Sequence, residues 1–375
     1  MGDVKSSISP TPRQPIRYQI RLPSNNKRAT IRQMRASNCR RTLQFVIVVI
    51  VVLTRGTVGL ANENNKLPTI TFHYSPAKGL GWEKGVTRRD PSDVIKVGDT
   101  YYVWYSKVRN EPGVFNYPSG YSATIWYATS KDGHNWAERG EALGKGEPGT
   151  WDDEGVYTPG ILAANGKYYL GYDGANKPWT EHSPASEGMA VADSPNGPWH
   201  KLPNNPIDTP TKDRSRFDSF RVCDVCLLVH NGKFWWFYKG RGLGKTPQQT
   251  EQGVAIADHP EGPYHKYKGN PVAHGGHEVL AWPQGKGIAL LIGVVGPKGV
   301  RNTIQYAPDG LHFQPVAKVG NSPAAPGGYR PDAFTDSKDA RPMSWGLSMG
   351  YSHGDVYLER FDCDLTGLKL PSGNH

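Results

Sequence analysis

The stretch GKFWWFYKG (Gly232–Gly240), followed by GVAIADHPEGPY (Gly253–Tyr264), is one copy of a pattern that recurs five times along the chain. Each copy opens with an aromatic-rich strand, and a second strand that usually ends in a glycine turn follows it. The other first strands are Gly98–Ser106, Gly166–Tyr172, Gly285–Gly293 and Met343–Tyr351, and the other second strands are Ile125–Trp136, Gly188–Trp199, Thr303–Phe313 and Val356–Leu365. Short strands that repeat at this scale predict an all-β fold, a five-bladed β-propeller with one central pocket.

The composition around the repeats agrees with many tight turns. The chain has 44 Gly and 31 Pro without a collagen-like period, and no stretch reads as a long amphipathic helix. No phosphate-binding glycine loop, zinc-protease motif or nucleophile-elbow motif occurs. We therefore expect a leader over residues 1–61, an N-terminal arm over 62–85, and one propeller catalytic domain over 86–375.

The leader has the features of an export signal. Leu43–Leu53 is an apolar run that follows Arg40 and Arg41, and the small residues around Ala61 form a cleavage pattern. A membrane-spanning helix needs about 20 apolar residues, so we interpret this run as a secretory signal peptide. The protein is then periplasmic or extracellular. Three alternatives stay open: a start at Met34, a twin-arginine signal, and an uncleaved leader that anchors the chain to a membrane.

The basic balance of the chain comes from the leader. Residues 1–61 hold 11 Lys or Arg and one acid, Asp3; without them, the totals of 44 basic and 34 acidic residues fall to 33 of each. A nucleic-acid-binding domain keeps a basic face, and this near-neutral remainder does not indicate one. We expect no nucleic-acid partner.

The cysteines do not suggest a disulfide framework. Cys39 belongs to the leader, which leaves Cys223, Cys226 and Cys363. The Cys-x-x-Cys spacing permits a metal or redox site, but no second pair supplies the further ligands of a zinc centre. We interpret the pair mainly as small buried side chains in a strand.

Acidic residues precede three of the five aromatic strands, at the positions that become innermost in a propeller. They are Asp90, Asp224 and Glu278, with Arg89 and His277 beside them. The second repeat has Tyr157-Thr158-Pro159 at this position and the fifth has Arg330 and Asp332. Any single acid here can simply cap a turn. Three that converge on one pocket can hydrolyse a glycosidic bond, which needs a base, an acid and a group that tunes them.

The neighbouring residues of the fourth repeat and several polar or aromatic side chains extend this candidate site. His277 and Glu278 can both face the pocket only if the strand bends there, because strand neighbours alternate. We name Arg89, Trp126, His134, Thr158 and Trp179 as candidate substrate-binding residues, since sugars stack on aromatic rings and bind polar groups. The paired aromatics Tyr168-Tyr169 and Trp235-Trp236 are better explained as packing between blades.

Taken together, these strings resemble glycoside hydrolase family 117. The resemblance rests on RDPSDVIKVGDTYYVWYSK, IWYATSKDGHNWAERGEAL, VYTPGIL, VCDVCLLVHNGKFWWFYKG, GHEVLAWP and NTIQYAPDGLHF, and it covers residues 85–365 approximately. It implies a five-bladed propeller, distantly related to families 43 and 32. It also implies exo-acting, inverting release of 3,6-anhydro-L-galactose from α-1,3-linked neoagaro-oligosaccharides, or from a related galactan oligosaccharide, during agar degradation.

Residue by residue, the resemblance implies that Asp90 is the general base and that Asp224 orients the substrate and tunes the acid. It places the general acid at His277 or Glu278. It implies no required cofactor, although members can hold a divalent metal ion whose ligands we do not assign. The family's S-x-A-x-x-R arm supports a domain-swapped homodimer, whereas this chain has Ser75 and Ala77 but Leu80 in place of the arginine.

Two other functions remain open from the sequence. A family 43-like arabinosidase or xylosidase would use the same three acidic groups. A non-catalytic, sugar-binding propeller would use acids only to hold a ligand, but it would not need them at three blade starts.

Overall fold

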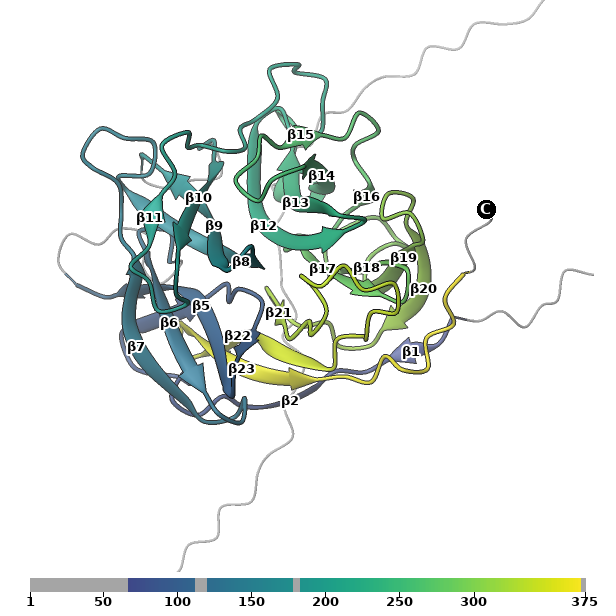
Figure 1. Ribbon diagram of the computed structural model, residues 1–375, viewed down its shortest axis with the longest axis horizontal. Coiled ribbons are helices and arrows are strands. Elements are labelled where there is room, and N and C mark those ends of the chain that lie inside the picture. The colour runs from purple at the N-terminus through teal and green to yellow at the C-terminus, as the bar shows by residue number, and fades with distance from the viewer. Residues whose placement is uncertain (1–66, 112–119, 178–182, 372–375) are drawn as a thin grey trace, which may run out of the picture. The chain divides into compact units, whose positions relative to one another are not determined.

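Five small sheets follow one another along the chain and stand around a common centre (Figure 1). The computed structural model describes residues 67–111, 120–177 and 183–371. These residues fall within the second of the two units into which the chain divides, Asn62–His375. The leader over 1–61, its alternative start at Met34 and the candidate Trp179 lie outside the described residues. In the described part, no helix has the length and apolar character needed to cross a membrane.

Each blade is a sheet of four or five strands that runs outward from the centre. Blade 1 contains β3 (Val86–Arg89), β4 (Ile95–Val97), β5 (Thr100–Arg109), β6 (Thr124–Ser130) and β7 (Trp136–Leu143). Blade 2 contains β8 (Gly155–Ala164), β9 (Lys167–Ala175), β10 (Ser186–Ala192) and β11 (His200–Lys201). Blade 3 contains β12 (Arg221–His230), β13 (Lys233–Arg241), β14 (Glu251–Ala257), β15 (His265–Lys266) and β16 (Ala273–His274).

The last two blades also take strands from the N-terminal arm. Blade 4 contains β17 (Leu280–Gln284), β18 (Gly287–Ile292), β19 (Thr303–Ala307), β20 (Gln314–Val319) and β1 (Thr69–Ile70), which pairs in parallel with β20. Blade 5 contains β21 (Gly327–Gly328), β22 (Trp345–Ser352), β23 (Asp355–Asp362) and β2 (His73–Pro76). The only helical element of the described residues is the short 3₁₀ helix η1 (Pro247–Gln249). The predicted all-β, five-bladed propeller is therefore confirmed.

The aromatic strands that dominate the repeats are the second strands of their blades. The innermost strands β3, β8, β12, β17 and β21 precede them and form the inner ring. This order explains the position of the acids, because residues just before each aromatic strand lie on or beside the innermost strand.

The core consists of one apolar cluster at each junction between blades. Trp235 packs against blade 4 with Ala281 and Ile288, whereas its neighbour Trp236 packs against blade 2 with Leu162. Successive side chains of a strand point to opposite faces, so two adjacent tryptophans can serve two junctions. The interpretation of these paired aromatics as packing between blades is confirmed.

The N-terminal arm closes the ring within the same chain. Strand β2 pairs antiparallel with β23 and becomes the outermost strand of blade 5. Phe72 is 1% exposed and meets the ring of Phe361 edge to face, with centroids 5.5 Å apart. Leu80, which stands where the family motif has arginine, is fully buried in the cluster between blades 5 and 1. In this chain Leu80 is therefore a packing residue.

Candidate active site

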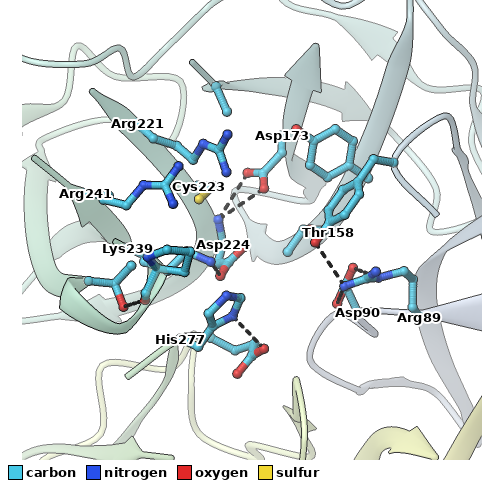
Figure 2. Close-up of a pocket in the computed structure, with 16 residues that line it drawn as sticks. Arg89, Asp90, Thr158, Asp173, Arg221, Cys223, Asp224, Lys239, Arg241 and His277 are labelled. Atoms are coloured by element: carbon cyan, nitrogen blue, oxygen red, sulfur yellow. Dashed lines mark hydrogen bonds and ion pairs between the residues drawn. The ribbon is translucent and has the colours of Figure 1, made fainter. Parts of the chain in front are cut away.

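A cavity of about 630 Å³ opens at the centre of the ring and receives side chains from blades 1 to 4 (Figure 2). The candidates Arg89, Asp90, Thr158, Asp224, His277 and Glu278 all line it. Residues almost 190 positions apart in the sequence thus face one space.

The innermost strands deliver these residues through a repeated irregularity. The ladder between β8 and β9 shifts register between Tyr157 and Gly160, and that between β12 and β13 shifts between Cys223 and Cys226. The residue after the last regular pair has a positive φ in three blades: 48° at Asp90, 47° at Thr158 and 65° at Asp224. A bulge re-aims a side chain, so each of these groups turns toward the centre.

The same ring position can be followed through all five blades. A smaller cavity next to the first is lined by Asp90, Thr158, Asp224, Glu278 and Ala325. The expectation for blade 5, Arg330 and Asp332, was therefore wrong. Arg330 is buried and pairs with Asp93 at 2.5 Å, and Asp332 pairs with Arg341 at 2.8 Å. These two residues precede β22 by a longer loop than their counterparts, which is why the sequence misplaced them.

The carboxylate of Asp90 is held by its neighbour in the chain. Arg89 Nε donates to Asp90 Oδ2 at 2.6 Å, and Arg89 Nη2 donates to Oδ1 at 3.3 Å. The guanidinium lies over the ring of Tyr121, 4.6 Å from its centroid. A Cβ at Gly120, which has a φ of 81°, would come within 2.5 Å of Arg89 Cδ. These contacts fix the carboxylate, since a two-point arginine pair defines its orientation.

Asp224 lies in a denser set of charges on the opposite wall. Its carboxylate pairs with the Lys239 ammonium, and its backbone N–H donates to Asp173 Oδ1 at 3.1 Å and Oδ2 at 3.3 Å. Burial raises the pKa of Asp224, although Lys239 opposes this change. Burial and the nearby Asp224 charge raise the pKa of Asp173 well above its usual range. Both effects favour the protonated form of Asp173.

His277 and Glu278 reach the cavity together because the chain bends before them. Gly275 and Gly276 both have a φ of 84°, and the strand β17 begins only at Leu280. His277 Nδ1 lies 2.8 Å from Glu278 Oε1. Burial favours a protonated Glu278, but the charges of His277, Lys239 and Arg89 outweigh it and lower the Glu278 pKa to about 2. Glu278 is consequently a carboxylate at neutral pH.

Two of the sequence-based candidates do not reach this cavity. Trp126 lies on β6 with its ring 3.6 Å from Lys107 Nζ, and Lys107 in turn pairs with Glu138. His134 is exposed in the turn between β6 and β7, where its backbone N–H donates to Asp132. Both were named because sugars stack on aromatic rings and bind polar groups, but neither is on an inner strand.

Sequence reasoning missed the polar residues that the second strands contribute. Asp173 on β9 pairs opposite Tyr157, and Lys239 on β13 pairs opposite Cys223, so the two hold equivalent positions in blades 2 and 3. Each is a charged residue near the end of an otherwise apolar aromatic strand, in YYLGYDG and FWWFYKG. That contrast was the available signal. Arg221 and Arg241 complete this wall of the cavity.

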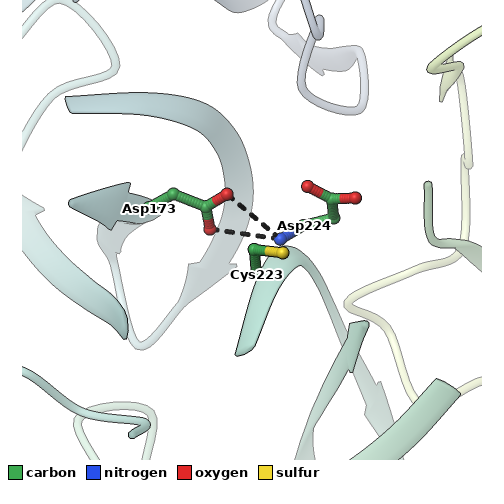
Figure 3. A group of neighbouring side chains, drawn as sticks. All are labelled: Asp173, Cys223 and Asp224. Carbon is green, nitrogen blue, oxygen red and sulfur yellow. Dashed lines mark hydrogen bonds between the residues drawn. The ribbon is translucent and has the colours of Figure 1, made fainter. Parts of the chain in front are cut away.

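Asp173, Cys223 and Asp224 form a group whose ligand atoms lie within 4.8 Å of one another (Figure 3). Their surroundings do not suit a divalent metal ion. The Lys239 ammonium already pairs with Asp224, both oxygens of Asp173 accept the Asp224 N–H, and burial raises the pKa of the Cys223 thiol well above its usual range. A cation here would have to displace an ammonium and deprotonate a thiol. No chemical step at this site is therefore assigned to a metal ion.

The cysteines are free and buried, but they differ in surroundings. Cys226 belongs to the core between blades 3 and 4, as expected for a small buried side chain. Cys223 lines the cavity. Cys223 precedes the bulge at Asp224 and lies at the cavity, whereas Cys226 follows the bulge and lies in the core.

Comparisons with known proteins give two kinds of match. Residues 85–225 match the family described as Glycosyl hydrolases family 43. A family 117 glycoside hydrolase produced by the marine bacterium Zobellia galactanivorans is 32% identical in sequence; the match covers 82% of this chain and 96% of that chain, with a TM-score of 0.71. A comparison with curated proteins gives no match.

More distant structures share the fold alone. An endo-arabinase from Bacteroides thetaiotaomicron is 14% identical, with 81% of this chain and 100% of that chain covered and a TM-score of 0.52. An α-L-arabinofuranosidase from Podospora anserina is also 14% identical, with 80% and 97% covered and a TM-score of 0.53.

Proposed function

Because the chain belongs to glycoside hydrolase family 117, we propose that it acts as an exo-glycosidase that removes 3,6-anhydro-L-galactose from α-1,3-linked neoagaro-oligosaccharides or a related galactan oligosaccharide, with inversion. The observation that carries this proposal is the convergence of Asp90, Asp224 and the His277–Glu278 pair, from blades 1, 3 and 4, on one cavity. An inverting glycosidase needs a base and an acid on opposite sides of the sugar.

Asp90 is the general base in this mechanism. Its two-point pair with Arg89 holds the carboxylate in a fixed orientation at the cavity, where it takes a proton from the attacking water. The water then adds to the anomeric carbon from the face opposite the leaving group, which inverts the configuration.

His277 is the proton donor, and Glu278 positions it. A general acid must carry a proton at the working pH, and the Glu278 pKa of about 2 leaves that group ionised. The Glu278 carboxylate accepts a hydrogen bond from the Nδ1 side of the ring, so His277 presents Nε2 to the glycosidic oxygen. The sequence had left the choice between these two residues open.

Asp224 orients the substrate and adjusts the charge around the acid. It lies between the Lys239 ammonium and the His277–Glu278 pair. Burial raises the pKa of Asp224, Lys239 and His277 lower it, and Glu278 raises it. A buried carboxylate can accept hydrogen bonds from sugar hydroxyls that strengthen as the oxocarbenium-like transition state forms.

The decisive experiment compares neoagarobiose with aryl arabinosides and aryl xylosides as substrates. We expect turnover of neoagarobiose, and a loss of about 10²- to 10⁴-fold in kcat for Asp90→Asn, the range that one general base contributes. Asp332→Asn is the matched control, because its carboxylate lies outside the cavity. Full activity of the Asp90→Asn protein would refute the assigned base.

A family 43-like arabinosidase or xylosidase is the second candidate, because the family 43 match spans both Asp90 and Asp224. The same assay separates the two functions. Turnover of the aryl pentosides without turnover of neoagarobiose would select this alternative.

We also propose that the protein is exported, on the strength of the apolar run Leu43–Leu53 and the cleavage pattern that ends at Ala61. Mass spectrometry of the mature protein should then give an N-terminus at Asn62. A mature chain that keeps Leu43–Leu53 would contradict cleavage.

A further inference from the structure

A second, wider cavity of about 1270 Å³ adjoins the catalytic cavity beside blades 3 and 4. Thr250 lines both cavities. Its hydroxyl donates to the carbonyl of Gly276 at 2.7 Å, and Gly276 directly precedes the proposed acid His277. The wider cavity, which we call the side groove, therefore continues from the acid's end of the catalytic site.

The rim of the side groove is cationic. Arg214, Arg216 and Lys245 line it, and across residues 67–111, 120–177 and 183–371 none of them forms an ion pair with a carboxylate. The acid in the lining, Glu251, is already paired with His274 at 2.5 Å.

A neighbouring acid on the same loop does not neutralise the rim. Asp213 accepts hydrogen bonds from Ser215, at 2.7 Å from its hydroxyl and 2.9 Å from its N–H. The groove therefore has three cations and one nearby carboxylate that is already hydrogen-bonded. This leaves an excess of positive charge. A concave surface lined by charge of one sign attracts ligands of the other sign.

The lining of the groove also includes apolar side chains. Leu243 is 42% exposed, and Phe217 stacks on Tyr238. Gly275 and Gly296 pass so close that a Cβ on Gly275 would lie 2.7 Å from the Cα of Gly296. A groove lined by both apolar and cationic side chains suits a sugar ring that carries an anionic substituent, because the C–H face of the ring packs on the apolar groups and the substituent pairs with the cations.

The position of the groove identifies the part of the substrate that it can hold. A general acid protonates the oxygen of the leaving group, so the leaving sugar lies on the acid's side of the cleaved bond. The groove is lined by Gly275, two residues before His277, and by Thr250, which also lines the catalytic cavity. We propose that the side groove binds the leaving-group sugars, and that these carry an anionic substituent, a sulfate ester or a carboxylate. This inference rests on the glycosidase function proposed above and specifies the substrate class for it.

Binding to an inactive protein tests the groove independently of turnover. The full-length Asp90→Asn protein is titrated with neoagarobiose, with neoagarobiose sulfated at O6 of galactose, and with the analogue that has galacturonate as reducing sugar. We expect at least one anionic ligand to bind about ten-fold more tightly than the neutral one, with an advantage that shrinks as salt rises. The two anionic ligands distinguish a sulfate from a carboxylate.

Charge removal supplies the matched comparison. Arg214→Ala/Arg216→Ala/Lys245→Ala, in the Asp90→Asn background, should abolish the advantage of the anionic ligand. The control is Lys167→Ala/Lys233→Ala/Lys286→Ala, which removes the same charge from exposed lysines at the opposite ends of the blade strands. This control should keep the advantage and so exclude an effect of net charge.

The outcomes separate this inference from the proposed function. Equal affinity for all three ligands, or an advantage that survives in the groove variant, overturns the side groove as an anion subsite. Failure of the wild type to hydrolyse any glycoside refutes the proposed function, whatever the titrations give.

Discussion

Buried charges in the catalytic cavity are arranged as pairs, and the pair of Asp224 and Lys239 is the most enclosed. The two residues are 9% and 7% exposed. Removing one partner of such a pair leaves a buried charge without compensation, which costs about 3–5 kcal/mol. Asp224→Asn should therefore lower the free energy of unfolding by about this amount and also abolish activity.

The double variant Asp224→Asn/Lys239→Met separates the two effects. It removes both charges, so most of the lost stability should return, while hydrolysis stays absent because the carboxylate is missing. Urea unfolding and hydrolysis assays measure the two quantities. A single variant as stable as the wild type, or a double variant as unstable as the single one, would contradict this account.

Glu278 links stability to pH. Its folded-state pKa of about 2 lies below the ordinary value of 4.5, so the folded state favours the ionised form. The resulting stability is fully present above pH 4.5 and is lost as pH falls toward 2. Glu278→Gln should reduce the free energy of unfolding by about 1–3 kcal/mol at pH 7, and the difference should disappear near pH 2.

Unfolding curves of the two proteins at pH 7, 4 and 2 measure this change. Glu251→Gln is a suitable control, since Glu251 pairs with a histidine outside the catalytic cavity. If the free energies of unfolding of Glu278→Gln and wild type differ by the same amount at pH 7, 4 and 2, the folded state does not lower the pKa of Glu278.

At the residue scale, some residues of the candidate site could be recognised from the sequence and others could not. Asp90, Asp224 and Glu278 were recognisable because acids are costly at inner positions unless they are paired or used. The positive φ values of Asp90 and Asp224 were not recognisable, and Thr158 shows why: threonine has no preference for that conformation, and only the bulge imposes it. Asp173 was missed because its place in the cavity depends on the strand opposite it.

At the element scale, the repeated aromatic strands can be recognised in the sequence, whereas an irregular strand cannot. The aromatic second strands recur in the sequence because each has two faces to fill between blades. The innermost strand of blade 5 gives no such signal, since β21 consists of Gly327 and Gly328. A Cβ on Gly327 would lie 1.9 Å from the carbonyl oxygen of Ser92, so this close approach to blade 1 excludes the residues by which a strand is recognised.

The N-terminal arm should contribute to the stability of the ring through Phe72. Phe72 anchors the arm between β1 and β2 by packing on Phe361 in the cluster between blades 4 and 5. Phe72→Ala should lower the free energy of unfolding by about 3–5 kcal/mol, the usual cost of a buried phenylalanine. Thermal or urea unfolding measures the loss.

The neighbouring residue provides the control for that change. His73 is exposed on the same arm, so His73→Ala should alter the free energy of unfolding by less than about 0.5 kcal/mol. Equal effects of the two substitutions would mean that the arm does not close the ring through Phe72.

At the scale of the whole molecule, the ring determines which groups can meet. The five repeats predicted the propeller, and their phase predicted that acids from blades 1, 3 and 4 share a pocket. The side groove could not be predicted in this way. It is lined largely by residues of the connections between strands, at 214–217 and 242–250, and the repeated strand pattern does not mark connections.

The ring also bears on stereochemistry, because Asp90 and His277 come from blades 1 and 4, which are not adjacent. Blade 5 lies between them on one side, and blades 2 and 3 on the other. Inversion with Asp90 as the base requires room for a water beside its carboxylate and forms no covalent intermediate, whereas retention needs carboxyl groups only about 5–5.5 Å apart. Hydrolysis of neoagarobiose in water with added methanol should therefore yield the free sugar and no methyl glycoside, and intact-mass spectrometry should find no glycosylated protein. A glycosidase that transfers to methanol serves as the positive control. A methyl α-glycoside, or a protein adduct on Asp90, would instead identify Asp90 as a nucleophile in a two-step mechanism.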